Sequence, residues 1–194
     1  MNASSRVSDV HVLEGARGSV VAQTAWIVLF GGLTALGAQV EIARYPVPYT
    51  LQTLFVLLSG AFLGARNGAL SQIAYLLAGA VGAPVFSSAG FGIARLFGPT
   101  GGYLLAFPLA AAVVGYLVRQ RRTLLWTGLS MAAGLLVVFI SGTVQLKAVL
   151  VLDWAAAFSG GFLIFSWWDI VKVSAAAMIY HEIARRWPSV PAEG

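Results

Sequence analysis

Long apolar runs, each closed by charged residues or by a turn, dominate the pattern of hydrophobic and polar positions along the chain. A helix needs about 20 mostly apolar residues to cross a bilayer. Six runs reach that length or approach it with their neighbours: Val20–Val40, Leu51–Leu63 with Tyr49, Thr50 and Gly64, Ala69–Phe86, Gly102–Val118, Leu124–Leu146 and Trp168–Ala184. The sequence therefore predicts an all-α membrane protein, folded as a bundle of six transmembrane helices.

The segments outside these runs are short. Residues 1–18 form a polar N-terminal segment, residues 19–186 contain the six-helix transmembrane domain, and residues 187–194 form a short C-terminal tail. Between the fifth and sixth helices, residues 148–167 are apolar but are interrupted by Asp153 and by a pair of glycines. Irregular backbone is not tolerated where it faces lipid, so we expect a re-entrant or interfacial piece that covers part of the protein.

Cationic residues are distributed unequally between the two ends of the predicted helices. If the N-terminus is cytoplasmic, eight cations fall on the cytoplasmic side: Arg6, Arg17, Arg66, Arg119, Arg121, Arg122, Arg185 and Arg186. Three fall on the opposite side: Arg44, Arg95 and Lys147. Because cytoplasmic loops carry an excess of Lys and Arg, the pattern predicts a multi-pass cell-membrane protein with both termini in the cytoplasm.

Composition agrees with a chain that lies almost wholly in lipid. Hydrophobic residues make up 59% of the sequence and charged residues 10%, whereas soluble domains carry about 25% charged residues. The net charge of +5 does not indicate nucleic-acid binding. That function requires basic residues on one face with interleaved aromatics, and the arginines here separate hydrophobic runs instead.

Small residues recur every four positions in three of the predicted helices. The stripes are Gly60, Gly64 and Gly68, then Gly31 and Ala35, then Gly79 and Ala83. Such stripes let helix backbones approach closely in a membrane. Packing within the chain and docking of a partner subunit are both consistent with them, and the stripe in the first helix is a candidate docking surface.

Asp169 and Lys172 are a charged pair inside the last predicted helix. They lie three positions apart and therefore share one helix face. Each costs ~2.5–3.5 kcal/mol at the bilayer centre on insertion scales, so such residues usually face a cavity, pair with each other and mark a functional path. A purely structural ion pair, with the lysine reaching the surface, is the alternative.

Two turns are expected on the same side of the membrane as the start of the last helix. Gly98–Tyr103 is a glycine-rich helix start whose backbone N–H groups suit an anion such as a carboxylate, although a tight loop that binds nothing explains it equally. Pro46–Gln52 opens the second helix. Trp168 is near enough to Asp169 to form part of a pocket wall. This convergence predicts a binding site that opens outward.

No segment carries a recognised catalytic or nucleotide-binding motif. GxxxxGK[ST] does not occur, so the chain has no P-loop, and neither a GxSxG elbow nor an HExxH helix is present. His11 and His181 have no second ligand at metal spacing. We therefore expect neither an enzyme nor a metal site. A membrane enzyme and a passive channel remain the rival classes, and only one predicted helix carries the charges that a channel lining would need.

Five segments together match the pattern of one known family. They are Pro46–Leu54, similar to PVPxTLQTL, then Gly60–Gly64, Gly82–Phe86, Gly98–Leu104, similar to GPTGGYL, and Asp169–Lys172. The chain resembles BioY, the biotin-specific S component of energy-coupling-factor (ECF) transporters. The resemblance covers roughly residues 20 to 185. The first and fourth segments together make it specific.

The resemblance implies a six-helix bundle with an outward-facing vitamin site. It also implies a complex with a transmembrane coupling subunit and two cytoplasmic ABC ATPase subunits, with biotin as the transported ligand and no separate cofactor. The substrate-binding residues expected from the motifs and the turns are Asp169, Lys172, Gln52, Tyr103, Trp168 and Arg95. An S component for another vitamin is the alternative.

The chain departs from the family pattern at two places. It has Trp167-Trp168 where the family usually has Pro-Gly before the aspartate, so we expect the start of the last helix to differ locally. It has Ser87–Arg95 where many members are glycine-rich, so we expect this loop to close the pocket differently.

Overall fold

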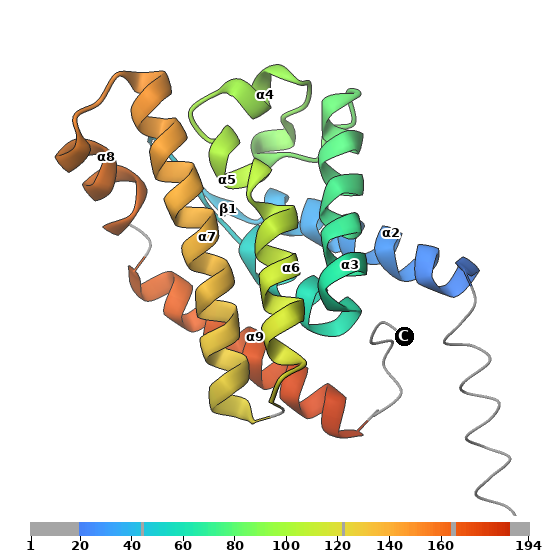
Figure 1. Ribbon diagram of the computed structural model, residues 1–194. Helices are drawn as coiled ribbons and strands as arrows, with labels where there is room; N and C mark the ends of the chain where they lie inside the picture. The colour runs from blue at the N-terminus through green and yellow to red at the C-terminus, as the bar shows by residue number, and fades with distance from the viewer. Residues whose placement is uncertain (1–19, 44, 122, 164–165, 187–194) are drawn as a thin grey trace, which may run out of the picture.

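Helices make up most of the computed structural model, which describes residues 20–43, 45–121, 123–163 and 166–186. The longer helices are α2 (Val20–Gln39), α3 (Gln52–Ala80), α6 (Phe107–Val118), α7 (Leu124–Leu150) and α9 (Ser166–Arg186). The short elements are β1 (Glu41–Ile42), β2 (Tyr49–Thr50), η1 (Ser87–Ala89), α4 (Ala94–Phe97), α5 (Gly101–Leu105) and α8 (Trp154–Gly161). In Figure 1, α7, α6 and the second half of α3 stand side by side, and α9 crosses their lower ends.

The prediction of an apolar helical membrane protein is confirmed in its main feature. Among the described residues, four helices are long and apolar enough to cross a membrane: α2, α3, the α5–α6 segment Gly101–Val118, and α7. The second predicted run and most of the third form α3, which breaks at Gly64 and ends at Ala80, before the predicted end of the third run at Phe86. α9 is not among the four. The count of six spans therefore stays a prediction.

Gly64 divides α3 into two halves that pack against each other. Its φ of 78° lies in the left-handed region that glycine adopts readily. A Cβ on Gly68 would lie 2.8 Å from the Cα of Gly60, and one on Gly60 would overlap the carbonyl oxygen of Ala111 in α6. This stripe of small residues therefore serves packing within the chain.

The small residues of α2 also face inward. Gly31 is buried, and a Cβ added there would lie 3.0 Å from the backbone oxygen of Ser71 in the second half of α3. The partly buried Ala35 packs against a hydrophobic core cluster. The proposed docking surface on α2 is thus occupied by the chain's own helices at these two positions.

A buried polar cluster joins α2 to both halves of α3. The amide nitrogen of Gln72 lies within hydrogen-bond distance of the hydroxyls of Thr34 (3.2 Å), Ser59 (3.1 Å) and Ser71 (3.1 Å). All four side chains are fully buried. Buried polar groups are costly without partners, so this cluster fixes the relative positions of three helical segments.

The connection between the fifth and sixth predicted helices contains a short helix. The side chain of Asp153 accepts a hydrogen bond of 2.7 Å from the backbone nitrogen of Ala156 and so caps α8. α7 continues to Leu150, four residues past its predicted end, and Lys147 lies over the ring of Trp154 at 5.0 Å. A single cation ends an apolar run but does not end a helix.

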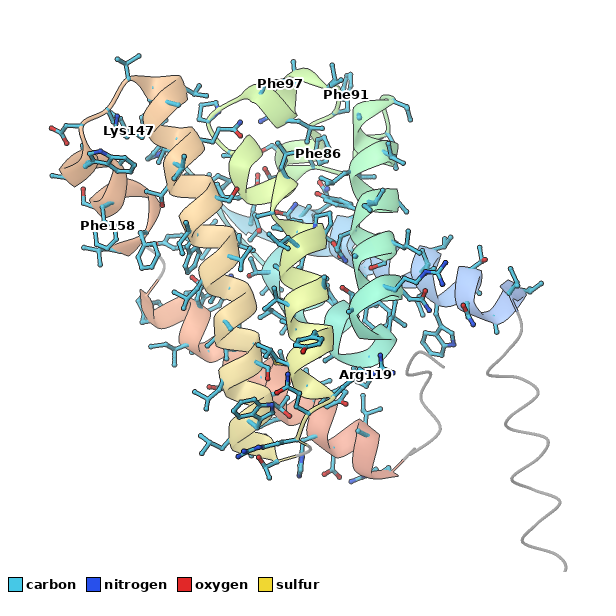
Figure 2. The ribbon with its side chains drawn as sticks, viewed as in Figure 1. Phe86, Phe91, Phe97, Arg119, Lys147 and Phe158 are labelled. Carbon is cyan, nitrogen blue, oxygen red and sulfur yellow. The ribbon has the colours of Figure 1, made fainter. Side chains whose placement is uncertain are left out.

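The segment between α3 and α5 folds back over the bundle. Gln39, at the end of α2, donates to the backbone oxygen of Phe86 (3.1 Å) and accepts from the nitrogen of Ala89 (3.2 Å). Phe86 is 1% exposed, whereas Phe91 and Phe97 are exposed at the outer edge of this segment (Figure 2). The segment is thereby held beside the β1–β2 hairpin, in which Glu41 lies opposite Thr50.

Candidate functional site

A cavity lies between the β1–β2 hairpin, the segment after α3, and helices α3, α5, α6, α7 and α9. We call it the central cavity; the space between atoms in this region amounts to about 580 Å³, part of which is open to solvent. Its polar lining residues are Thr50, Gln52, Thr53, Ser87, Arg95, Thr100, Asp169 and Lys172. Its apolar lining residues are Val47, Pro48, Phe86, Tyr103, Leu104, Phe107, Val138 and Phe139. Of these side chains, only that of Tyr103 carries a polar group, its phenol hydroxyl.

Asp169 and Lys172 lie together at the α9 wall of this cavity. The Nζ atom of Lys172 is 2.6 Å from Oδ1 of Asp169, 2.6 Å from the hydroxyl of Thr53 and 3.1 Å from the backbone oxygen of Thr50. An ammonium group has three N–H donors, so each has an oxygen partner within the protein. Lys172 is 5% exposed and does not extend to the surface as the structural alternative would require.

The Asp169 carboxylate is only partly engaged. Its Oδ1 atom is held in the ion pair, and no described residue donates a hydrogen bond to its buried Oδ2 atom. An ionised carboxylate offers about four acceptor positions, and leaving a buried one unpaired is costly. Asp169 therefore presents acceptor capacity to a ligand N–H group.

Gln52 lines the cavity, but both polar atoms of its side-chain amide form hydrogen bonds with other residues of the protein. Its nitrogen lies 2.7 Å from the hydroxyl of Tyr75, and its oxygen accepts from the hydroxyl of Thr50 at 3.2 Å. Tyr75 in turn donates to the backbone oxygen of Val85 at 3.3 Å. These bonds position the hairpin and the segment after α3 relative to each other.

Tyr103 contributes its ring to the cavity and its hydroxyl to the scaffold. The hydroxyl donates a 2.8 Å hydrogen bond to the buried carbonyl oxygen of Gly161, at the end of α8. The side chain is 6% exposed. Tyr103 thus ties α8 to α5 and forms part of the cavity wall.

Arg95 lies at the boundary between the central cavity and a second recess. This outer recess is lined by Glu41, Ala43, Pro46, Pro48, Ser87, Ser88, Arg95, Pro99 and Thr100. Pro48, Ser87, Arg95 and Thr100 line both spaces. The two turns singled out from the sequence therefore meet at the mouth of the central cavity.

The structure brings five of the six predicted site residues to one cavity. Trp168 is not among the residues that line it. Successive helix residues are about 100° apart, so a side chain next to Asp169 points to a different face. Sequence reasoning did not single out Thr50 and Thr53 as partners of Lys172, although both stand in the Pro46–Leu54 segment.

Comparisons with known proteins agree on one family. A model described as the BioY family matches residues 5–189. The "Biotin transporter BioY" of Thermotoga maritima is 41% identical over 151 residues, covering 78% of this chain and 89% of that protein. The "Probable biotin transporter BioY" of Pyrococcus horikoshii is 40% identical over 157 residues, covering 81% and 93%.

A solved structure shares the fold. It is described as the S-component for biotin from an ECF-type ABC transporter, and it superposes with a TM-score of 0.79. The match covers 85% of this chain and 92% of the other at 20% sequence identity. The family model and these relatives together show that the chain belongs to the BioY family.

Proposed function

We propose that this chain is the biotin-binding membrane subunit, or S component, of an ECF-type vitamin uptake transporter. The observation that carries the proposal is the central cavity, in which a partly engaged carboxylate faces an apolar wall. The chain belongs to a family whose curated members are named biotin transporters. These names describe transport rather than a chemical reaction, so we propose no enzymatic activity.

The chemistry of biotin fits the central cavity. The ureido group of biotin offers two N–H donors, and Asp169 has a buried oxygen without a donor. Lys172 holds the carboxylate in place and supplies its counter-charge. The apolar, sulfur-containing ring of biotin would then pack among side chains such as Phe107 and Phe139.

Arg95 is the proposed partner of the biotin carboxylate. It lies where the central cavity meets the outer recess, which places it at the mouth rather than at the α9 wall. A guanidinium group binds a carboxylate through two parallel hydrogen bonds. Biotin would therefore lie with its ring system toward Asp169 and its acid group toward the mouth.

We further propose six membrane spans, with residues 19–186 as one substrate-binding domain. The two halves of α3 would then count as two spans and α9 as the sixth. Of the cations in the described ranges and outside the predicted spans, Arg66, Arg119, Arg121, Arg185 and Arg186 belong to the predicted cytoplasmic side, and Arg95 and Lys147 to the opposite one. The excess favours cytoplasmic termini and a cell-membrane protein that captures biotin from outside.

The chain would need partners to accumulate biotin against a gradient. It contains no P-loop motif, so it has no evident means of its own to couple ATP hydrolysis to transport. We propose that a transmembrane coupling subunit and two ABC ATPase subunits complete the transporter, with no cofactor on this chain.

Isothermal titration of the detergent-purified protein against biotin tests the proposal. We expect saturable binding at one site per chain, and no comparable heat with other vitamins. Binding of a different vitamin with no response to biotin would instead support an S component of other specificity.

A further inference from the structure

Glu41 is a carboxylate that the proposed biotin site does not use. It stands on β1, where pairing with Thr50 fixes its position at the outer recess. One carboxylate oxygen accepts a hydrogen bond from the hydroxyl of Ser88. The other, Oε2, is buried, and no described residue donates a hydrogen bond to it.

This oxygen is a suitable partner for a cation. Among the described residues that line the outer recess, Glu41 is the one anion and Arg95 the one cation. Among the described residues, Glu41 and Arg95 do not form an ion pair with each other. A charged hydrogen bond from an ammonium group would satisfy Oε2 and is roughly twice as strong as a neutral one.

The outer recess continues directly from the central cavity. The two spaces share Arg95, Ser87, Pro48 and Thr100. A biotin molecule whose acid group lies near Arg95 would therefore direct any group attached to that acid into the recess. Such an attachment is an amide, which lacks the negative charge of free biotin. The arm would therefore pass Arg95 without forming an ion pair with it and enter the recess that Glu41 lines.

We propose that the outer recess is a second subsite, which binds the terminal ammonium group of biotin amides whose arm ends in a primary amine. The proposal rests on biotin binding in the central cavity. Glu41 is the residue that recognises the ammonium group, and Ser88 holds Glu41 in position.

Two ligands of matched shape test the proposal by isothermal titration. In 5-(biotinamido)pentylamine the arm ends in an ammonium group, and in a biotin hexylamide, an arm of equal length, it ends in a methyl group. We expect the parent protein to bind the amine about tenfold more tightly, the effect of roughly one charged hydrogen bond. Glu41→Gln keeps an oxygen for Ser88 but removes the charge, so it should abolish this preference and leave biotin affinity unchanged.

Glu182→Gln is the matched control. Glu182 forms an ion pair with Arg186 on α9 and does not line the outer recess. This variant should keep the tenfold preference. Equal binding of the two amides by the parent protein, or a preference that survives Glu41→Gln, would overturn the subsite while biotin binding stays intact. Absence of biotin binding to the parent protein would overturn the proposed function itself, and the subsite with it.

Discussion

Individual residues around the central cavity divide into those with spare hydrogen-bonding capacity and those without it. Lys172, Gln52 and Tyr103 each direct their polar atoms to protein partners. Asp169 keeps an oxygen that no described residue engages. The first group therefore shapes the cavity, and Asp169 is the residue expected to discriminate between ligands.

Replacing Asp169 with asparagine should weaken biotin binding by roughly tenfold to several-hundredfold. The change keeps the shape but places an N–H₂ group where a ureido N–H needs an acceptor, and a ligand hydrogen bond to a charged group contributes ~1.5–3 kcal/mol. Titration calorimetry measures the effect. Asp153→Asn is the control, since asparagine caps a helix as well as aspartate does; parental affinity in Asp169→Asn would mean that the ion pair is structural.

Replacing Tyr103 with phenylalanine should lower stability and leave ligand affinity within about twofold of the parent. The hydroxyl is bonded to the Gly161 carbonyl, and removal of a buried partner costs about 1–3 kcal/mol. In a chain of this length each kcal/mol shifts Tm by about 2–4 °C. Thermal unfolding in detergent and titration with biotin give the two readouts. A large loss of affinity at unchanged Tm would instead make the hydroxyl a ligand contact.

At the scale of helices, the apolar runs located the elements but not all their ends or breaks. Lys147 closed a predicted run, yet α7 continues to Leu150 because a cation near a helix end can reach water. The fourth run is divided at Ala106 into α5 and α6, next to Pro108, which lacks an N–H donor. Run length depends on hydrophobicity, whereas helix ends depend on backbone hydrogen bonds that composition does not specify.

The glycine stripes were recognised from their spacing, but their partners required three-dimensional information. A stripe of small residues has the same pattern whether it faces its own chain or another. The structure resolves Gly60 as an internal contact, because a Cβ there would overlap the carbonyl oxygen of Ala111. Spacing along one helix contains no information about which helix lies opposite.

Replacing Gly60 with alanine should destabilise the protein by about 1–3 kcal/mol through overpacking. The backbone of α6 would have to move away from α3, and thermal unfolding in detergent would report a lower Tm. Gly128→Ala is the matched control, because nothing lies within 4 Å of an added Cβ and alanine favours a helix over glycine by up to about 1 kcal/mol. Equal Tm values for Gly60→Ala and the parent would contradict the close packing of α3 and α6.

At the scale of the whole molecule, the sequence located the rim of the central cavity better than its interior. Two turns and the start of α9 were expected on one side, and they meet around the cavity. The three partners of Lys172 come from α9, α3 and β2. Such convergence depends on how helices cross, so Thr50 and Thr53 gave no sequence signal for this role. Helix periodicity, by contrast, could have separated Trp168 from Asp169.

The orientation of the molecule in the membrane is open to a direct test, because the chain contains no cysteine. Ala89 lies in the exposed segment beside the outer recess, and Gln120 lies in the exposed turn after α6. Figure 2 shows Lys147 and Arg119 toward opposite ends of the molecule.

In intact cells, a membrane-impermeant maleimide should label a cysteine at Ala89 but not one at Gln120, and tags at both termini should be protected. The physical reason is the excess of cations at the Gln120 end, which holds it in the cytoplasm. Labelling of the Gln120 variant alone would reverse the proposed orientation and place the outer recess on the cytoplasmic side.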